Sequence, residues 1–130
     1  MRRTIEIALA TILLSLFLAK AADEPVEGTW EGKTNGHRAV TVKVLEIRDR
    51  LEGHVIFYVV DKKFSDPDAV EVGQEEHEVS DLKWDGKVLS FKTREPDLTF
   101  TMTVTGEDTG VLKRDATKEQ PEQTFSMKRR

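Results

Sequence analysis

The chain contains no cysteine, and this absence excludes several classes of protein at once. Without cysteine there are no disulfides, no thiol nucleophile and no lipid-modified cysteine of the bacterial lipoprotein type. Serine offers no substitute, because none of the serines lies in a Gly-x-Ser-x-Gly or comparable setting. The sequence therefore gives no indication of a covalent catalyst.

A concentrated basic face is also missing. The formal net charge of the chain is −4, charges of both signs are interspersed, and the basic end Lys128-Arg129-Arg130 is short. Binding to the phosphates of a nucleic acid needs a concentrated basic surface. We therefore expect no nucleic-acid partner.

The long hydrophobic run that the chain does have lies at its N-terminus. Arg2 and Arg3 precede an almost wholly apolar stretch from Ile7 to Ala19, and Ala19-Lys20-Ala21 has the small-x-small form of a cleavage site. This pattern predicts a signal peptide over residues 1–21 and a periplasmic or secreted protein that begins at Ala22. The run is shorter than the roughly 20 residues that span a bilayer, so we expect no stable membrane insertion of the mature chain.

A helical hydrophobic stripe is absent after residue 22, where the dominant period is two. Leu98, Phe100, Met102 and Val104 alternate with threonines, which is typical of a strand with one apolar and one hydroxyl face. The same reasoning predicts eight strands, at residues 27–34, 39–48, 51–60, 74–84, 87–94, 98–105, 109–114 and 123–129.

The connections between these strands are mostly tight turns. Asn35-Gly36 and Asp85-Gly86 favour two-residue hairpins, and the segments 48–50 and 106–110 are short and polar. Two connections are longer, at residues 61–73 and 115–122. Consecutive strands joined in this way form an antiparallel meander, and closing it removes its open edges. We therefore predict an all-β fold, an eight-stranded antiparallel up-and-down barrel in one domain, residues 22–130.

Gly28-Thr29-Trp30 on the first predicted strand resembles the Gly-x-Trp motif of the lipocalins and their calycin relatives. The segments "GTWEGK", "LEGHVIFYVV" and "KWDGKVLSFK" are also similar to small exported lipocalin-like bacterial proteins of uncharacterised function. The resemblance implies that Trp30 closes one end of the barrel under a basic residue of the last strand, for which Arg129 is our choice beside its two neighbours. Gly28 and Gly32 leave room for the ring. The alternative is an ordinary core tryptophan.

The lipocalin resemblance implies a binding protein for a small apolar or amphipathic ligand. The expected lining residues are the large apolar side chains of the barrel together with Phe64, which lies on a loop that can act as a lid: Val42, Phe57, Phe64, Phe91, Phe100, Met102 and Phe125. Plain core packing explains the same residues if the barrel is solid. The alternative function is a protein-interaction module, such as an exported protease or lysozyme inhibitor that uses the segment "ADEPVE" and the acidic loops.

The third predicted strand breaks the apolar-in, polar-out alternation. If Val55, Phe57 and Val59 point into the barrel, then Ile56, Tyr58 and Val60 point outward. Three large apolar side chains on one outer face form a patch, which predicts a cover. The cover is a second copy in a homodimer, the leading segment 22–27 or the loop 61–73, unless the strand is partly exposed.

The three histidines provide no motif for a metal or an active site. Glu75 and His77 share one face of a predicted strand, but a third ligand must come from His54 or from elsewhere, and His37 lies beside a turn. Acidic residues are too abundant for any pair to indicate catalysis. We therefore predict no enzyme activity, no metal and no cofactor.

The signal-peptide prediction has a direct test. Expression of the full chain in a bacterium with a standard export pathway should yield a mature protein that begins at Ala22, because the small residues at 19 and 21 suit the signal peptidase. Intact-mass spectrometry of the purified protein measures this. A protein that keeps residues 1–21 would contradict the prediction, and Ala21→Arg should block the cleavage as a control.

Overall fold

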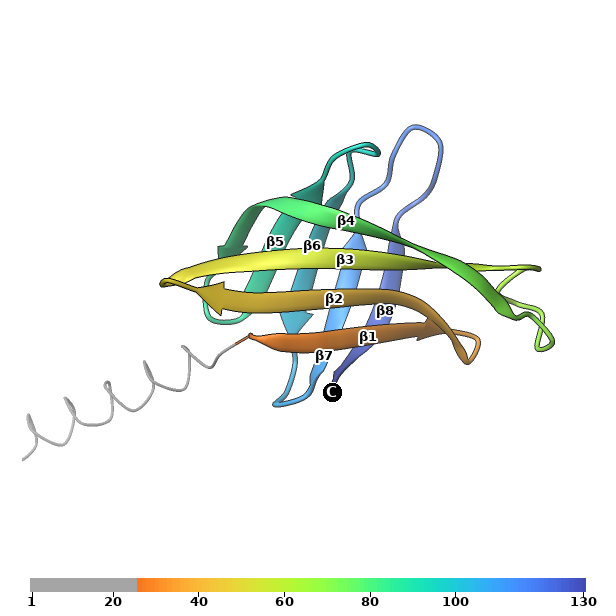
Figure 1. The fold of residues 1–130 in the computed structure, drawn as a ribbon, viewed down its shortest axis with the longest axis horizontal. Coiled ribbons are helices and arrows are strands. Elements are labelled where there is room, and N and C mark those ends of the chain that lie inside the picture. Colours follow the sequence, from red (N-terminus) through yellow and green to blue (C-terminus); the bar gives the residue numbers. More distant parts are fainter. Residues whose placement is uncertain (1–25) are drawn as a thin grey trace, which may run out of the picture.

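The computed structural model describes residues 26–130, and the predicted signal peptide lies outside them. In this part the chain forms eight antiparallel strands that close into one barrel, with each strand beside its neighbours in sequence (Figure 1). The strands are β1 (Gly28–Thr34), β2 (His37–Ile47), β3 (Arg50–Val60), β4 (Glu71–Trp84), β5 (Val88–Thr93), β6 (Thr99–Val104), β7 (Thr109–Arg114) and β8 (Gln123–Arg129). The predicted all-β up-and-down barrel is confirmed. Over these residues no helix is long and apolar enough to cross a membrane.

Two-residue turns join the first three strands. Asn35 and Gly36 have φ angles of 51° and 83°, and Arg48 and Asp49 have φ angles of 52° and 63°. Left-handed backbone at both central residues matches the right-handed twist of the flanking strands. Asn-Gly is the usual sequence for such a turn, whereas Arg48 takes up this conformation with an ordinary side chain.

Alternate residues of the strands point inward and form one packed core. Its buried side chains come from every strand except β4, which contributes half-buried residues at its C-terminal end. The fully buried core residues include Trp30, Val40, Val42, Val44, Val55, Leu89, Phe91, Phe100, Met102 and Leu112. The period of two in the sequence therefore corresponds to the two faces of the barrel wall.

Trp30 closes one end of the barrel. Its ring has no exposed surface, and its Nε1 donates a hydrogen bond of 2.9 Å to the carbonyl oxygen of Val26. The guanidinium of Arg129 lies 4.7 Å from the centre of the ring, which is cation–π distance. Arg129 also donates to the Glu27 carbonyl at 3.1 Å and faces the carboxylate of Asp108 at 3.4 Å. One arginine thus links the leading segment, the tryptophan and the β6–β7 turn.

The seam between β1 and β8 is short. It has three paired positions, Trp30 with Arg129, Glu31 with Lys128 and Gly32 with Met127. On the outer side, Arg130 reaches back to the buried carboxylate of Glu31 at 2.8 Å. The tryptophan contact therefore lies on the ladder that closes the barrel.

Gly32 leaves space that neighbouring side chains fill. A β-carbon at this position would lie 2.6 Å from the sulfur of Met127, 3.0 Å from Val40 and 3.2 Å from Phe125. These three neighbours are buried, so they have little room to move. At Gly28 a β-carbon would lie 2.9 Å from Arg129, and the φ angle of 133° also favours glycine. The two glycines therefore let β1 approach the packed core closely.

We expect Gly32→Ala to destabilise the protein by about 1–3 kcal/mol, because the added methyl group overpacks the core. Gly73→Ala is the matched control, since a β-carbon there meets no atom within 4 Å. That control should be neutral or stabilising by up to about 1 kcal/mol. Urea unfolding of the two variants measures the difference, and equal stabilities would show that the space beside Gly32 is not filled.

Strands β3 and β4 extend beyond the rest of the barrel. Pairing of β3 with β2 ends at Phe57, and pairing of β4 with β5 begins at Val79. Residues 58–60 and 71–74 therefore form a two-stranded projection, the β3–β4 ribbon, which reaches past the other strands (Figure 1). Val59 lies on this ribbon and is 44% exposed. The expectation that Val59 points into the barrel is wrong, because the barrel wall has ended there.

The outer residues of β3 are covered by the chain itself. Ile56 is 4% exposed and Tyr58 is 6% exposed, although both lie outside the main core. The guanidinium of Arg38 lies 3.9 Å from the centre of the Tyr58 ring, and the Tyr58 hydroxyl bonds Thr41 at 2.8 Å. The predicted cover of Ile56 and Tyr58 therefore comes from within the chain, and Val60 keeps partial exposure. The prediction of a homodimer at this face therefore no longer has the observation that supported it.

Ile56→Lys should now destabilise the monomer instead of releasing a subunit. Burial of an unpaired ammonium group costs on the order of 3 kcal/mol. Leu45→Lys is the control, because Leu45 is 52% exposed and a surface substitution changes stability by about 0.5 kcal/mol or less. Thermal unfolding with sedimentation velocity measures both properties. A stable Ile56→Lys monomer formed from a wild-type dimer would restore the subunit interface.

Candidate functional site

The barrel end opposite Trp30 holds a small pocket. Trp30 lies near the start of β1, whereas the pocket is lined by Thr34 at the end of β1 and Arg114 at the end of β7. Its volume is about 140 Å³. The lining of this aromatic pocket comprises Thr34, Ala39, Phe57, Tyr58, Phe64, Phe100, Arg114, Gln123 and Phe125.

Four phenylalanines give the pocket its apolar wall. The rings of Phe57 and Phe100 are 5.9 Å apart, and those of Phe100 and Phe91 are 5.1 Å apart and nearly parallel. Phe125 is buried, and Phe64 reaches the core from the connection between β3 and β4. Offset stacking of this kind is a favourable arrangement of aromatic rings.

The structure divides the seven predicted lining residues into two groups. Phe57, Phe64, Phe100 and Phe125 line the aromatic pocket. The remaining three, Val42, Phe91 and Met102, lie in the packed core and do not line the aromatic pocket. The reason is that large side chains fill the middle of an eight-stranded barrel, which leaves space only near its end.

Arg114 brings a charge to this apolar wall. It follows Leu112 on the inward face of β7 and lies opposite Phe100 in the β6–β7 ladder. One terminal nitrogen, Nη2, donates to the carbonyl oxygen of Pro121 at 2.9 Å. Its Nε is buried and has no hydrogen-bond partner among residues 26–130.

His77 contacts the ring of Phe57, with 5.6 Å between the ring centres, and does not line the pocket. Its buried Nε2 has no hydrogen-bond partner in the described chain and lies 3.7 Å from the carboxylate of Glu75. Arg114 Nε and His77 Nε2 are the two buried side-chain nitrogens without a hydrogen-bond partner within residues 26–130, and of the two residues Arg114 lines the pocket.

Arg114 is not among the predicted site residues, although the alternation of strand β7 indicates it. Gly110, Leu112 and Arg114 are separated by two residues each, so they share the inward face. A charged residue at the last inward position of a strand lies at the end of the barrel, where polar groups and a ligand can meet. His77 was recognised only as half of a possible metal pair.

The segment that carries Phe64 is held by several polar contacts. The backbone of Asp61 donates to Val70 O at 2.9 Å, and the Asp61 carboxylate accepts from the Val70 N–H at 2.8 Å. A bond of 2.8 Å joins His37 Nε2 to Asp66 O. These contacts define a closed 61–70 loop that places Phe64 beside the pocket.

Arg38 binds Glu71, where the connection between β3 and β4 ends. Its guanidinium forms two hydrogen bonds with the Glu71 carboxylate, at 3.0 and 2.9 Å. The hydrogen bond with Glu71 raises the pKa of Arg38 above its ordinary value. Because Arg38 also covers Tyr58, one side chain links the loop to the outer face of β3.

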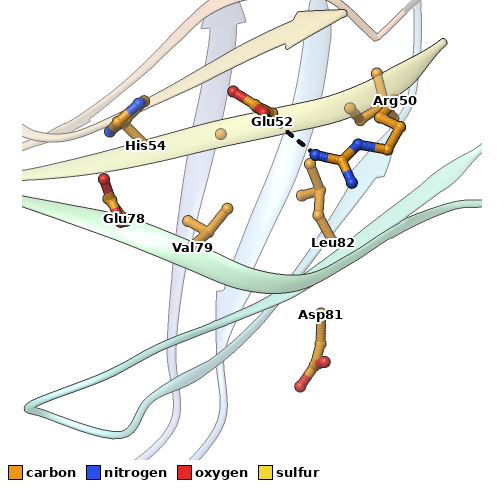
Figure 2. Close-up of a pocket in the computed structure, with 9 residues that line it drawn as sticks. Arg50, Glu52, His54, Glu78, Val79, Asp81 and Leu82 are labelled. Atoms are coloured by element: carbon orange, nitrogen blue, oxygen red, sulfur yellow. Dashed lines mark ion pairs between the residues drawn. The ribbon is translucent and has the colours of Figure 1, made fainter. Parts of the chain in front are cut away.

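A second hollow lies between the first residues of β3 and the last residues of β4. It has a volume of about 620 Å³ and is lined by residues 50–54 of β3 and by Glu78, Val79, Asp81 and Leu82 of β4. Figure 2 shows the ion pair between Arg50 and Glu52 and shows Asp81 turned away from the hollow. The side chains of Arg50 and Glu52 are 80% and 48% exposed, so water solvates these charges. The residues that line the larger hollow include no buried side-chain atom without a hydrogen-bond partner, whereas Arg114 Nε is such an atom in the lining of the aromatic pocket.

The histidines do not gather into a metal site in the part of the chain that the structure describes. No group of three histidine, cysteine, aspartate or glutamate side chains is placed to hold a metal ion there. His54 faces Glu76 at 3.7 Å, on the outer surface, whereas His77 faces the barrel interior. The two histidines therefore belong to different environments.

No protein-family model, curated protein or solved structure matches the chain. The resemblance to lipocalins consequently rests on the closed eight-stranded barrel and on the contact between Trp30 and Arg129.

Proposed function

We propose that this protein binds a small apolar or amphipathic molecule in the aromatic pocket. The observation that carries the proposal is a pocket of about 140 Å³ with a phenylalanine wall at the one barrel end that Trp30 leaves open. Binding sites for small molecules are concave, mostly apolar and supplied with a few polar groups. The aromatic pocket has this composition.

The pocket volume limits the size of the ligand group. An engineered apolar cavity of about 150 Å³ holds benzene. A pocket of about 140 Å³ therefore suits a single ring or a short branched chain, with any further part of the ligand outside the barrel. The function is that of an exported, lipocalin-like binding protein with a small pocket, in which the predicted signal peptide directs export.

A second function, protein interaction, is favoured by the β3–β4 ribbon. Val59, Val70 and Val72 are 44%, 59% and 63% exposed at or beside its tip. Exposed apolar groups on a projecting ribbon suit a contact with another protein. Within the inhibitor form of this function, Val26 is not free to contact a partner, because it is buried and its carbonyl oxygen accepts a hydrogen bond from Trp30.

An uncharged ring tests the proposed pocket. Titration of the ¹⁵N-labelled protein with toluene should shift the amide signals of Phe57, Phe64, Phe100 and Phe125, with a Kd on the order of 1 mM or below. Gln123→Trp should weaken binding about tenfold or more, because Gln123 lines the pocket and a larger side chain narrows it.

Thr124→Trp is the matched control, since Thr124 is the exposed neighbour of Gln123 and does not line the pocket. It should bind toluene as the wild type does. Wild-type spectra that stay unchanged with toluene and with cyclohexane would refute the binding function and favour protein interaction through the ribbon.

A further inference from the structure

We infer that the ligand of the aromatic pocket is a small carboxylic acid and that Arg114 anchors its carboxylate. The inference rests on the proposed function and adds the chemical class of the ligand. It follows from the placement of one charged side chain in a pocket whose wall is otherwise mainly aromatic.

The Nε of Arg114 needs an acceptor that the described chain does not provide. It is buried from water and has no hydrogen-bond partner among residues 26–130. Buried donors in native proteins are almost always satisfied, and a guanidinium favours carboxylate acceptors. An acid in the pocket supplies the missing oxygen after a small rotation of the side chain.

The acidic residues next to Arg114 and next to its ladder partner Gln123 lie close to another cation. Asp115 and Glu122 lie 4.0 and 3.5 Å from the ammonium of Lys113, which is on the outer face of β7. Within residues 26–130 no ion pair joins Arg114 to a carboxylate. Within the described residues, Lys113 has carboxylate partners and Arg114 has none, so the charge of Arg114 is available to a ligand.

His77 adds little to this argument, because it contacts Phe57 but does not line the pocket. Its buried Nε2 has no hydrogen-bond partner within residues 26–130, yet it lies 3.7 Å from the carboxylate of Glu75. The preference for a ligand with an oxygen acceptor over a pure hydrocarbon therefore rests on Arg114 Nε. A single guanidinium suits a monoanion.

The size of the pocket limits the apolar part of the acid. With about 140 Å³ available, the apolar part is one ring or a short branched chain, which Phe57 and Phe100 contact. Benzoate combines such a ring with a carboxylate. Benzamide has nearly the same shape without the charge, so the two compounds isolate the interaction with Arg114.

Isothermal titration of the wild type with these two probes tests the inference. Benzoate should bind at least about tenfold more tightly than benzamide, as expected for a hydrogen bond between charged groups. Arg114→Gln should remove this preference, so that benzoate and benzamide bind the variant with about equal affinity. Arg114→Lys should keep part of the preference, because it keeps the charge.

Lys113→Gln is the matched control, because it removes the same charge from the adjacent residue on the outer face. It should retain the full preference for benzoate, which separates a local contact from a general change in net charge. Thermal unfolding of each variant confirms that the barrel is folded before the comparison.

Equal binding of benzoate and benzamide to the wild type, or a benzoate preference that survives in Arg114→Gln, would overturn the inference while the pocket itself stands. A failure of toluene, benzamide and benzoate alike would instead refute the proposed function. The uncharged probes therefore distinguish the two failures.

Discussion

The contact between Trp30 and Arg129 is the interaction on which the barrel depends. It joins the first strand to the last at one of only three paired positions of the closing seam. A tryptophan buries a large apolar area, and the guanidinium above it satisfies the carbonyl oxygens of the turns at this end. Without that contact, closure would depend on a ladder of three paired positions and on the packing of Met127 and Phe125 beside Gly32.

Closure of one end decides where a ligand can bind. The middle of the barrel is filled by the core, and Trp30 with Val26 seals the first end. Space remains where β1 and β7 end, beside the loop that carries Phe64. The same geometry brings a charged residue to an apolar wall, because an inward position at the end of a strand is half in the core and half in water.

The 61–70 loop and the outer face of β3 share their anchors. His37 bonds Asp66 in the loop, and the next residue, Arg38, binds Glu71 and covers Tyr58. The start of β2 therefore fixes both the loop beside the pocket and the apolar residues outside the barrel. On the β3–β4 ribbon, Val59 and Val72 have no comparable cover and are 44% and 63% exposed.

The sequence by itself determined the eight strands, their order and the closure, because a period of two and tight turns are local properties of the chain. It also indicated Trp30 and a basic partner on the last strand, since that motif is short and continuous. Only the tertiary structure decided that Ile56 and Tyr58 are buried within the chain. The side chains that contact Tyr58, Arg38 and Thr41, lie on the neighbouring strand β2. The pocket and Arg114 were likewise decided by tertiary packing, because the free volume depends on how side chains from seven segments of the chain fill one barrel end. No single stretch of sequence determines that volume.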